Sequence, residues 1–530
     1  MLTLVPIGFN LFAAVVILIL SRVKANIGRV WLIAAIFSLS NWGIILGFRW
    51  LYPLQINFPE WFPLGEISQR GIFLQLDSIS WPLLLALCAV QTAVIITDSS
   101  RLDEIPSPSI WSGLFLVYSV GYLAALINSI LSILLVWALV DIIEFMILIR
   151  TAISNQKVNE IVVSFAIKIL GLFFLIFGLL ISYEQGTPLS IGQEVNSVGF
   201  IVLIAVGLRL GVIPFNLPFV SGSPIRRGLG NSIRMVSVAT SIIILLRLPM
   251  GNFEPRVLGL LLTFTVIGIF FGAIMWYGSS SELEGRPYWI VSMAGLAIYS
   301  SINGNQIATL AWTLALILSG SVLFLYSARG KKLGMIPLLS LIGITGLPFT
   351  PSVIGWEGII MSTGFIRNIM MVLSISLIIL GYLRHATRLE SLLIQKEKWI
   401  WITYPLGLTI LIITQWTIFL VSDLQWYLSG IVLGSIVAFL LPIIFYFLIQ
   451  KYFQKSEYSD FLKKVLTPIG DFIIRFLSFR WIYNLIWSIL GVIQKFVNAM
   501  TNILEGQGGI IWVIVFLVMI ITLITSGDLS

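Results

Sequence analysis

Long apolar stretches alternate with short polar loops over almost the whole chain. A helix needs about 17 to 25 mostly apolar residues to cross the hydrocarbon core of a bilayer. The pattern predicts an all-α, polytopic membrane protein with about sixteen transmembrane helices. We place these spans at residues 2–21, 30–48, 79–97, 108–127, 130–149, 160–182, 198–215, 229–248, 256–276, 288–303, 307–326, 334–363, 366–387, 400–421, 426–449 and 508–526.

Two of the predicted spans contain helix-breaking prolines. Pro214 interrupts the seventh span, and Pro348 and Pro351 interrupt the twelfth. Broken helices are tolerated at membrane depth only where the freed backbone lines a cavity or is buried in protein. A matching pair of interrupted spans indicates an inverted repeat with its site near mid-membrane. Because five spans separate the two breaks, we predict two five-helix inverted repeats with broken helices 7 and 12.

The pattern also divides the chain into five successive parts. They are N-terminal helices and an outer loop at 1–74, a core with inverted repeats at 75–390, additional transmembrane helices at 391–450, an amphipathic interfacial segment at 451–505 and a C-terminal transmembrane helix at 506–530. In the segment at 451–505, Lys and Arg are mixed with Phe, Ile, Leu and Trp, which is typical of an amphipathic helix lying in the headgroup plane.

Composition narrows the chemistry that the chain can perform. Of its 530 residues, 58% are hydrophobic and only 10% are charged, which leaves no room for a sizeable soluble domain. Cys88 is the single cysteine and His385 the single histidine, which excludes an internal disulfide, a cysteine-ligated cluster and a multi-histidine metal site. We therefore expect no cofactor, no metal and no catalytic or redox centre in this chain.

The net charge of +8 is a signal of membrane topology. Lys and Arg lie far more often in the odd-numbered loops, and cytoplasmic loops collect these residues. The pattern predicts that both termini lie on the outer side of the membrane, and it explains the charge without nucleic-acid binding. No basic segment precedes the first span, so we expect a retained helix in the plasma (inner) membrane of a prokaryote.

Ionisable residues inside the predicted spans are the candidates for an ion pathway, because intramembrane charges are costly and usually face a polar path. Asp141 and Glu144 lie one turn apart on one helix, and Lys168 is a plausible partner for Asp141. Two alternatives stay open: Glu144 could pair with Arg150 at the helix end, and Arg234 could extend to the cytoplasmic edge. The candidates are Asp141, Glu144, Lys168, Arg209, Arg234 and Glu357.

Four stretches of the chain occur in an order and spacing that carry a family resemblance. The stretches are Leu76-Asp77-Ser78-Ile79-Ser80, Ile133-Leu134-Leu135-Val136-Trp137-Ala138-Leu139-Val140, Gly207-Leu208-Arg209-Leu210-Gly211-Val212-Ile213-Pro214 and Gly346-Leu347-Pro348. Through them the chain resembles the proton-conducting, antiporter-like membrane subunits of respiratory complex I (NADH:quinone oxidoreductase subunits of the L, M and N type), which are shared with multi-subunit sodium/proton antiporters and membrane-bound hydrogenases.

The resemblance implies a site in which this chain departs from the family. There, a glutamate on the fifth helix pairs with a lysine on the seventh, and the lysine passes a proton on. Here Ala138 stands at the glutamate position, so Asp141 would substitute for it. Arg209 stands at the lysine position, and arginine keeps its proton in essentially any protein. Glu357 lies one position beyond the family's charged residue on the twelfth helix.

The resemblance therefore implies a membrane-arm subunit of a complex I-like assembly that moves protons or sodium, with a proton relay that is altered or lost. Its partners would be other membrane subunits, lipid and the transported ion. Two further hypotheses remain: a stand-alone secondary ion transporter, and a purely structural scaffold subunit. The scaffold differs from an ion-conducting protein in whether Asp141, Lys168, Arg209 and Glu357 line one hydrated layer at mid-depth or point separately into packed interfaces.

Overall fold

The computed structural model describes most of the chain. The described residues are 2–57, 73–105, 107–152, 154–186, 198–213, 225–248, 253–327, 333–360, 364–388, 398–422, 432–453, 480–505 and 509–527. The chain separates into two compact units, Met1–Lys451 and Tyr452–Ser530, and each is described by itself below.

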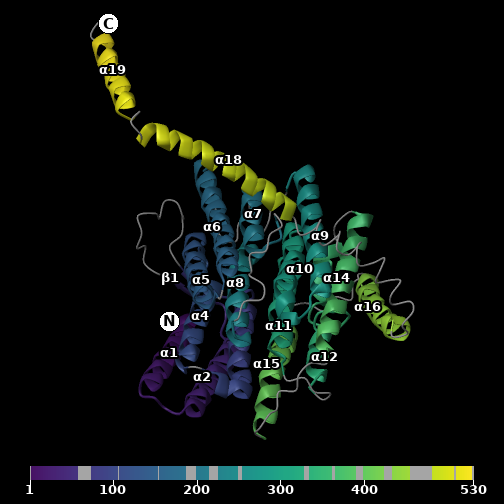
Figure 1. Ribbon diagram of the computed structural model, residues 1–530. Helices are drawn as coiled ribbons and strands as arrows, with labels where there is room; N and C mark the ends of the chain where they lie inside the picture. Colours follow the sequence, from purple (N-terminus) through teal and green to yellow (C-terminus); the bar gives the residue numbers. More distant parts are fainter. Residues whose placement is uncertain are drawn as a thin grey trace. The chain divides into compact units, whose positions relative to one another are not determined.

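The first unit is a bundle of helices (Figure 1). A helix overlaps each of the first fifteen predicted spans, and two separate helices, α12 and α13, lie in the twelfth. The bounds are α1 Val5–Arg22, α2 Ile27–Gly47, α3 Ser80–Thr97, α4 Ser109–Leu126, α5 Ile130–Thr151, α6 Asn155–Glu184, α7 Gly199–Leu210, α8 Arg227–Arg247, α9 Pro255–Gly278, α10 Glu282–Ile302, α11 Gln306–Leu325, α12 Met335–Ile342, α13 Glu357–Ile360, α14 Phe365–Ala386, α15 Ile400–Val421 and α16 Val432–Phe453.

Shorter elements complete the described part of this unit. Four 3-10 helices are η1 Leu2–Leu4, η2 Phe48–Trp50, η3 Asp98–Glu104 and η4 Val353–Trp356. The strands β1 Leu54–Asn57 and β2 Phe73–Leu76 form an antiparallel pair in which Leu54 lies opposite Leu76. The second unit contains α18 Arg480–Glu505, within the predicted amphipathic segment, and α19 Gly509–Gly527, at the predicted last span.

By length and composition, eleven helices of the described residues can cross a membrane. The protein is therefore a multi-pass membrane protein, and the full count of sixteen crossings stays a prediction. The seventh and twelfth helices are too short to cross by themselves, since α7 has 12 residues and α12 has 8.

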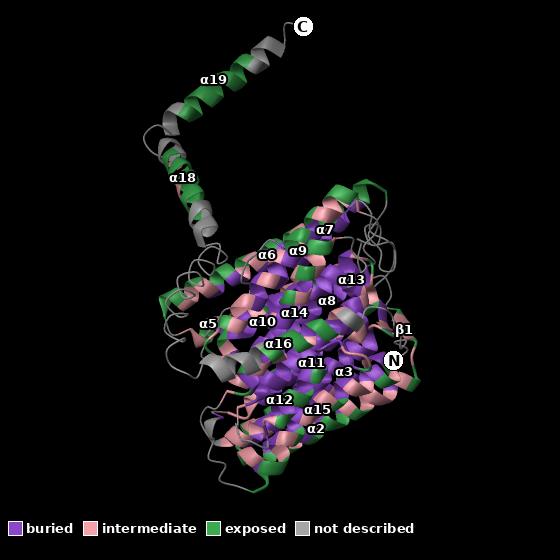
Figure 2. Ribbon diagram, turned by 90° about the vertical axis from the view of Figure 1, so that its right-hand side faces the viewer, coloured by how far each residue is buried: buried purple, intermediate pink, exposed green. Residues whose placement is uncertain are grey.

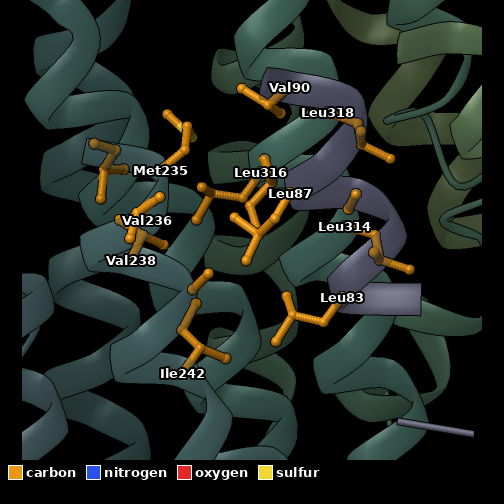
Figure 3. Close-up of a cluster of buried hydrophobic side chains, with 14 of the residues drawn as sticks. Leu83, Leu87, Val90, Met235, Val236, Val238, Ile242, Leu314, Leu316 and Leu318 are labelled. Carbon is orange, nitrogen blue, oxygen red and sulfur yellow. The ribbon is translucent and has the colours of Figure 1, made fainter. Parts of the chain in front are cut away.

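The core of the first unit lies where α3, α8 and α11 meet. Every residue in the apolar stretch of α3 is buried, and so are 94% of the residues in the apolar stretches of α8 and α11. In α1 and α6 the buried share is 33% (Figure 2). The apolar side chains of α3, α8 and α11 interdigitate, as Leu87, Val236 and Leu316 show (Figure 3). Helices buried on all sides need no polar face, which explains why α3 and α11 are mostly apolar all round.

Buried tryptophans connect helices that are distant in the sequence. The indole nitrogen of Trp137 on α5 donates to the carbonyl of Thr240 on α8, at 2.7 Å. On α11, the indole of Trp312 donates to the carbonyl of Gly355 in η4, at 2.9 Å. A large apolar ring with one donor suits such positions, because its N–H must find a partner when it is buried.

Helix α7 ends earlier than we predicted. Pro214 was expected to break the seventh span, but α7 ends at Leu210, and Pro214 lies outside the described residues. The cause is Gly211, which adopts a left-handed conformation with φ of 79°. The amide of Val212 then donates to the carbonyl of Gly207 at 2.9 Å, the bond expected when a left-handed glycine ends a helix.

Helix α12 also ends before its prolines, at Ile342. Pro348 and Pro351 lie in the non-helical segment that follows. Gly346 has a φ of 65°, which favours glycine, and its Cα faces the indole of Trp356 so closely that a Cβ would overlap that ring. The break is therefore built around a glycine under a tryptophan ring as well as around prolines.

Candidate buried ion-pair site

Asp141 on α5 and Arg209 on α7 form a two-point ion pair. Nη1 of Arg209 lies 2.5 Å from Oδ2 of Asp141, and Nη2 lies 2.9 Å from Oδ1. Both side chains are completely buried. Such a fork-to-carboxylate contact is stronger and more directional than a single hydrogen bond. Removing one partner would leave an uncompensated buried charge, at a cost of about 3–5 kcal/mol.

Further contacts fix the guanidinium of Arg209 in place. Its Nε donates to the hydroxyl of Ser241 on α8 at 3.1 Å, and Nη1 donates to the carbonyl of Lys168 at 3.4 Å. The guanidinium carbon lies 4.2 Å from the centre of the Trp137 ring, which is a cation–π contact. The permanent charge of Arg209 is therefore bound by groups from α5, α6 and α8.

A glycine allows α6 to approach Arg209 this closely. A Cβ on Gly171 would lie 2.8 Å from both the backbone oxygen of Ala205 and Cγ of Arg209. Any side chain at position 171 would force α6 away from α7. The packing of these two helices therefore depends on Gly171.

Glu144 and Lys168 form a second buried ion pair. Nζ of Lys168 on α6 lies 2.5 Å from Oε2 of Glu144 on α5. The ammonium group also donates to the hydroxyl of Ser237 on α8 at 3.1 Å. The side chains are only 3% and 6% exposed, so water does not screen this interaction from the outside.

The two ion pairs lie one helical turn apart. Asp141 and Glu144 are three residues apart on α5, and Ser237 and Ser241 are four residues apart on α8, so both helices present their polar groups in matching order. The hydroxyl of Ser241 donates to the carbonyl of Ser237 at 2.8 Å, which leaves its oxygen free to accept from Arg209.

This arrangement corrects two expectations. We predicted Lys168 as the partner of Asp141, with Arg150 as an alternative partner for Glu144. The ion pairs of the described residues instead join Asp141 to Arg209 and Glu144 to Lys168. The planar fork of arginine matches both carboxylate oxygens of Asp141, whereas the compact ammonium of Lys168 contacts one oxygen of Glu144.

Small cavities flank Glu144. One, of about 10 Å³, is lined by Asp141, Glu144, Ser164 and Lys168 together with apolar side chains. Another, also of about 10 Å³, lies between Glu144 and valines of α4 and α8. Each volume is close to that needed for about one water molecule, and a water needs polar partners, which the first cavity supplies.

Arg234 lies on α8 one turn before Ser237 and is buried rather than extended to the surface. Its Nη1 donates to the carbonyl of Gly230 at 3.0 Å, and Glu144 is the carboxylate that acts on it electrostatically. Close by, Arg227 at the start of α8 pairs with Glu282 at the start of α10, at 2.7 Å.

Glu357 is not part of this group in the described structure. It begins α13, directly after η4, and is half-buried. Helix α13 packs against α10, α11 and α14, whereas the two ion pairs lie among α5, α6, α7 and α8. Among the described residues, no ion pair or hydrogen bond is recorded for the Glu357 side chain. Of the four residues whose alignment would separate the hypotheses, Asp141, Lys168 and Arg209 lie together with Glu144, and Glu357 does not lie among them.

The described residues contain no group of three or more His, Cys, Asp and Glu side chains that could hold a metal ion. The site itself presents two ion pairs, hydroxyl groups and two small cavities.

Comparison with known proteins places this geometry in a fold. No family model matches the sequence, and no curated protein matches it. Among solved structures, a chain of the Mrp complex from Dietzia sp. DQ12-45-1b aligns with a TM-score of 0.70 at 13% identity, over 100% of this chain and 63% of that chain. A chain of the membrane-bound sulfane sulfur reductase (MBS), an archaeal respiratory membrane complex, aligns with a TM-score of 0.68 at 13% identity, over 98% and 99%.

The chain has the fold of these membrane-complex subunits. The predicted all-α, polytopic membrane fold is confirmed, and so is the resemblance to antiporter-like membrane subunits at the level of the fold, whereas the two inverted repeats stay a prediction. At 13% identity the likeness concerns the fold alone. Within this antiporter-like fold, the residues of the α5–α8 group are those of the present chain and have to be interpreted from their own contacts.

Sequence reasoning missed the position or the pairing of several charged residues of this chain. Arg286 and Glu282 are buried in α10, but the predicted tenth span began at residue 288 and left both in a loop. Arg247, at the end of α8, pairs with Asp77, which precedes α3, at 2.5 Å. The sequence places Asp77 and Arg247 near the ends of predicted spans, but it does not indicate that these two residues pair.

Proposed function

We propose that the chain is a cation-translocating, antiporter-like subunit of a multi-subunit, complex I-like membrane assembly, with an altered proton relay. In this proposal Lys168 and Glu144 exchange the proton, while Arg209 and Asp141 provide a fixed, paired charge beside them. The observation that carries the proposal is a buried lysine–glutamate pair next to a cavity of about 10 Å³ that Asp141 and Ser164 also line.

The difference between the two cations supports this division of roles. Lysine can release its proton when it is buried, whereas arginine cannot. Lys168 therefore has the property that the family's seventh-helix lysine contributes, although it lies on α6. Its Nζ lies 2.5 Å from Glu144 and 3.1 Å from the Ser237 hydroxyl, so the proton has an acceptor and a polar neighbour within hydrogen-bond range.

The surroundings of Glu144 support access to the pair. Its carboxylate borders both small cavities, one toward α6 and one toward α4 and α8. Water in such cavities would connect the pair to further polar groups without opening the bundle. Asp141 lines only the first of these two cavities, and each of its carboxylate oxygens already accepts a bond from Arg209.

The test is Lys168→Arg in the assembled host complex, reconstituted in lipid vesicles. Arginine keeps the positive charge opposite Glu144 but cannot give up its proton. We expect assembly to be retained and ion translocation to fall at least tenfold. The matched control is Lys157→Arg on the same helix. Lys157 pairs with Glu160 at 2.7 Å, and both side chains are about one-third exposed. Translocation should be unchanged in this variant.

A structural scaffold is the second candidate, and the Arg209–Asp141 pair favours it. A permanently charged residue bound at five points by three helices resembles a structural clamp more than a carrier. If Lys168→Arg assembles and translocates ions at the normal rate, the scaffold function is the better explanation, and the relay proposal is wrong.

A further inference from the structure

A groove of about 830 Å³ lies between α6, α7 and α9. Its wall on α7 is formed by Phe200, Ile204 and Leu208, which follow each other at intervals of four residues and therefore lie on one face of that helix. The described residues that line the groove on all three helices are apolar, apart from one carboxylate at an end. Such a lining suits hydrocarbon, since a cavity holds water only where polar groups surround it.

The groove is open on the exposed side of the bundle. Leu208 and Leu261 are buried at its floor, at 4% and 2% exposed, whereas Leu260 and Phe264 of α9 are 61% and 50% exposed beside it. In a multi-pass membrane protein, apolar side chains that are exposed in this way lie against the hydrocarbon of the bilayer or against a neighbouring subunit. The occupant of the groove therefore enters from within the membrane.

The length of the groove matches one leaflet of a bilayer. From Glu254 to Phe264 the α9 wall rises by about 15 Å, at about 1.5 Å per residue. This is half of the hydrocarbon core, which is about 30 Å thick. A helix about 10–12 Å wide would occupy roughly 1,200–1,700 Å³ over the same length, which is more than the groove provides. The dimensions therefore favour a hydrocarbon chain over a transmembrane helix of a partner.

One end of the groove carries a negative charge. Glu254 is the only charged residue among the described residues of the lining, and it is exposed directly before α9. Its side chain does not cap the helix, so the carboxylate is available to a ligand. The start of the helix itself carries a partial positive charge, which favours a phosphate group nearby. A headgroup with both an ammonium and a phosphate group therefore fits this end better than a purely anionic one.

We propose that the groove binds an acyl chain of phosphatidylethanolamine, with the ammonium group of this lipid donating to Glu254. A primary ammonium has three donors for the carboxylate, whereas the quaternary ammonium of phosphatidylcholine has none. The lipid lies against the face of α7 that Leu208 presents, and the next residue, Arg209, belongs to the buried ion pair. It thus supports the short helix that holds Arg209. Binding of this lipid does not depend on whether the chain translocates ions.

The experiment titrates the full chain, delipidated in detergent, with phosphatidylethanolamine, phosphatidylcholine or phosphatidylglycerol that carry the same acyl chains. Native mass spectrometry counts the lipid molecules that the protein retains. We expect the wild type to retain its first phosphatidylethanolamine at a lipid concentration at least tenfold lower than that needed for phosphatidylcholine. Phosphatidylglycerol should be retained least, because Glu254 repels its negative headgroup.

Variants at the two parts of the site separate headgroup from chain. Glu254→Gln should abolish the preference for phosphatidylethanolamine, and Glu254→Lys should shift it to phosphatidylglycerol; the position is exposed, so neither change disturbs the core. Ile204→Trp fills the groove with an indole, and retention of all three lipids should fall at least tenfold. The matched control is Ile36→Trp on α2, where the side chain is 55% exposed, and this variant should behave as the wild type.

Other outcomes overturn the proposal. Equal retention of the three lipids by the wild type, or a preference that persists in Glu254→Gln, would remove the headgroup contact. Full retention of phosphatidylethanolamine by a folded Ile204→Trp would place the lipid elsewhere. Retention by the chain alone, but not by the assembled host complex, would assign the groove to a neighbouring subunit.

Discussion

Asp141 and Glu144 lie one turn apart on α5, yet they neutralise cations of different kinds. Asp141 accepts two bonds from the permanently charged Arg209, and Glu144 accepts one from the titratable Lys168. A fixed charge and a movable proton are thus neighbours in one buried group.

Asp141→Asn should destabilise the protein severely, by about 3–5 kcal/mol, because it leaves Arg209 buried without a counter-ion. The double variant Asp141→Asn, Arg209→Met should be milder than Asp141→Asn alone, since no orphaned charge remains. Unfolding of the purified chain measures both. A loss in the double variant that equals or exceeds that of Asp141→Asn would contradict this, because it would show that the orphaned charge is not the cause of the loss.

Arg209→Lys should be tolerated by the fold and weaken it moderately. A lysine keeps the charge opposite Asp141 but has no planar fork, so it gives up the second bond to the carboxylate and the flat contact with Trp137. We expect a loss of about 1.5–3 kcal/mol, the size of one charge-assisted bond. Unfolding experiments test this, and a loss as large as that of Asp141→Asn would contradict it.

Gly171→Ala should weaken the contact between α6 and α7. The added Cβ would lie 2.8 Å from a backbone oxygen of α7 and from the Arg209 side chain, and backbone cannot yield easily. We expect destabilisation by about 1–3 kcal/mol. Gly259→Ala on α9 is the matched control: no atom lies within 4 Å of its Cβ position, so this change should be neutral or stabilising.

The sequence was sufficient for the helices but not for their pairings. Apolar length identified the helical segments, because a bilayer demands it. The charged residues inside these apolar segments were also identified, namely Asp141, Glu144, Lys168, Arg209 and Arg234. The partners depend on which faces of α5, α6, α7 and α8 meet, and helices with little polar contrast do not reveal their facing side. Lys168 was therefore assigned to Asp141, although it contacts Glu144.

The ends of helices explain the remaining differences. Residue counting began the tenth span at 288, so the buried Arg286 was taken as a loop residue, whereas α10 begins at Glu282. Likewise α7 ends at a left-handed Gly211 and not at Pro214. Local backbone conformation decides these boundaries, and apolar periodicity does not report it.

Glu357→Gln tests whether the proposed ion path extends to the broken twelfth helix. Glu357 is half-buried at the start of α13, and no ion pair is recorded for it among the described residues, so neutralising it should change stability by less than about 0.5 kcal/mol. If its carboxylate passes protons onward, translocation by the assembled complex in vesicles should fall at least tenfold with assembly intact. Glu160→Gln, in the partly exposed pair with Lys157 on α6, is the control and should have no effect. Unchanged translocation in Glu357→Gln, together with loss in Lys168→Arg, would confine the path to the α5–α8 group.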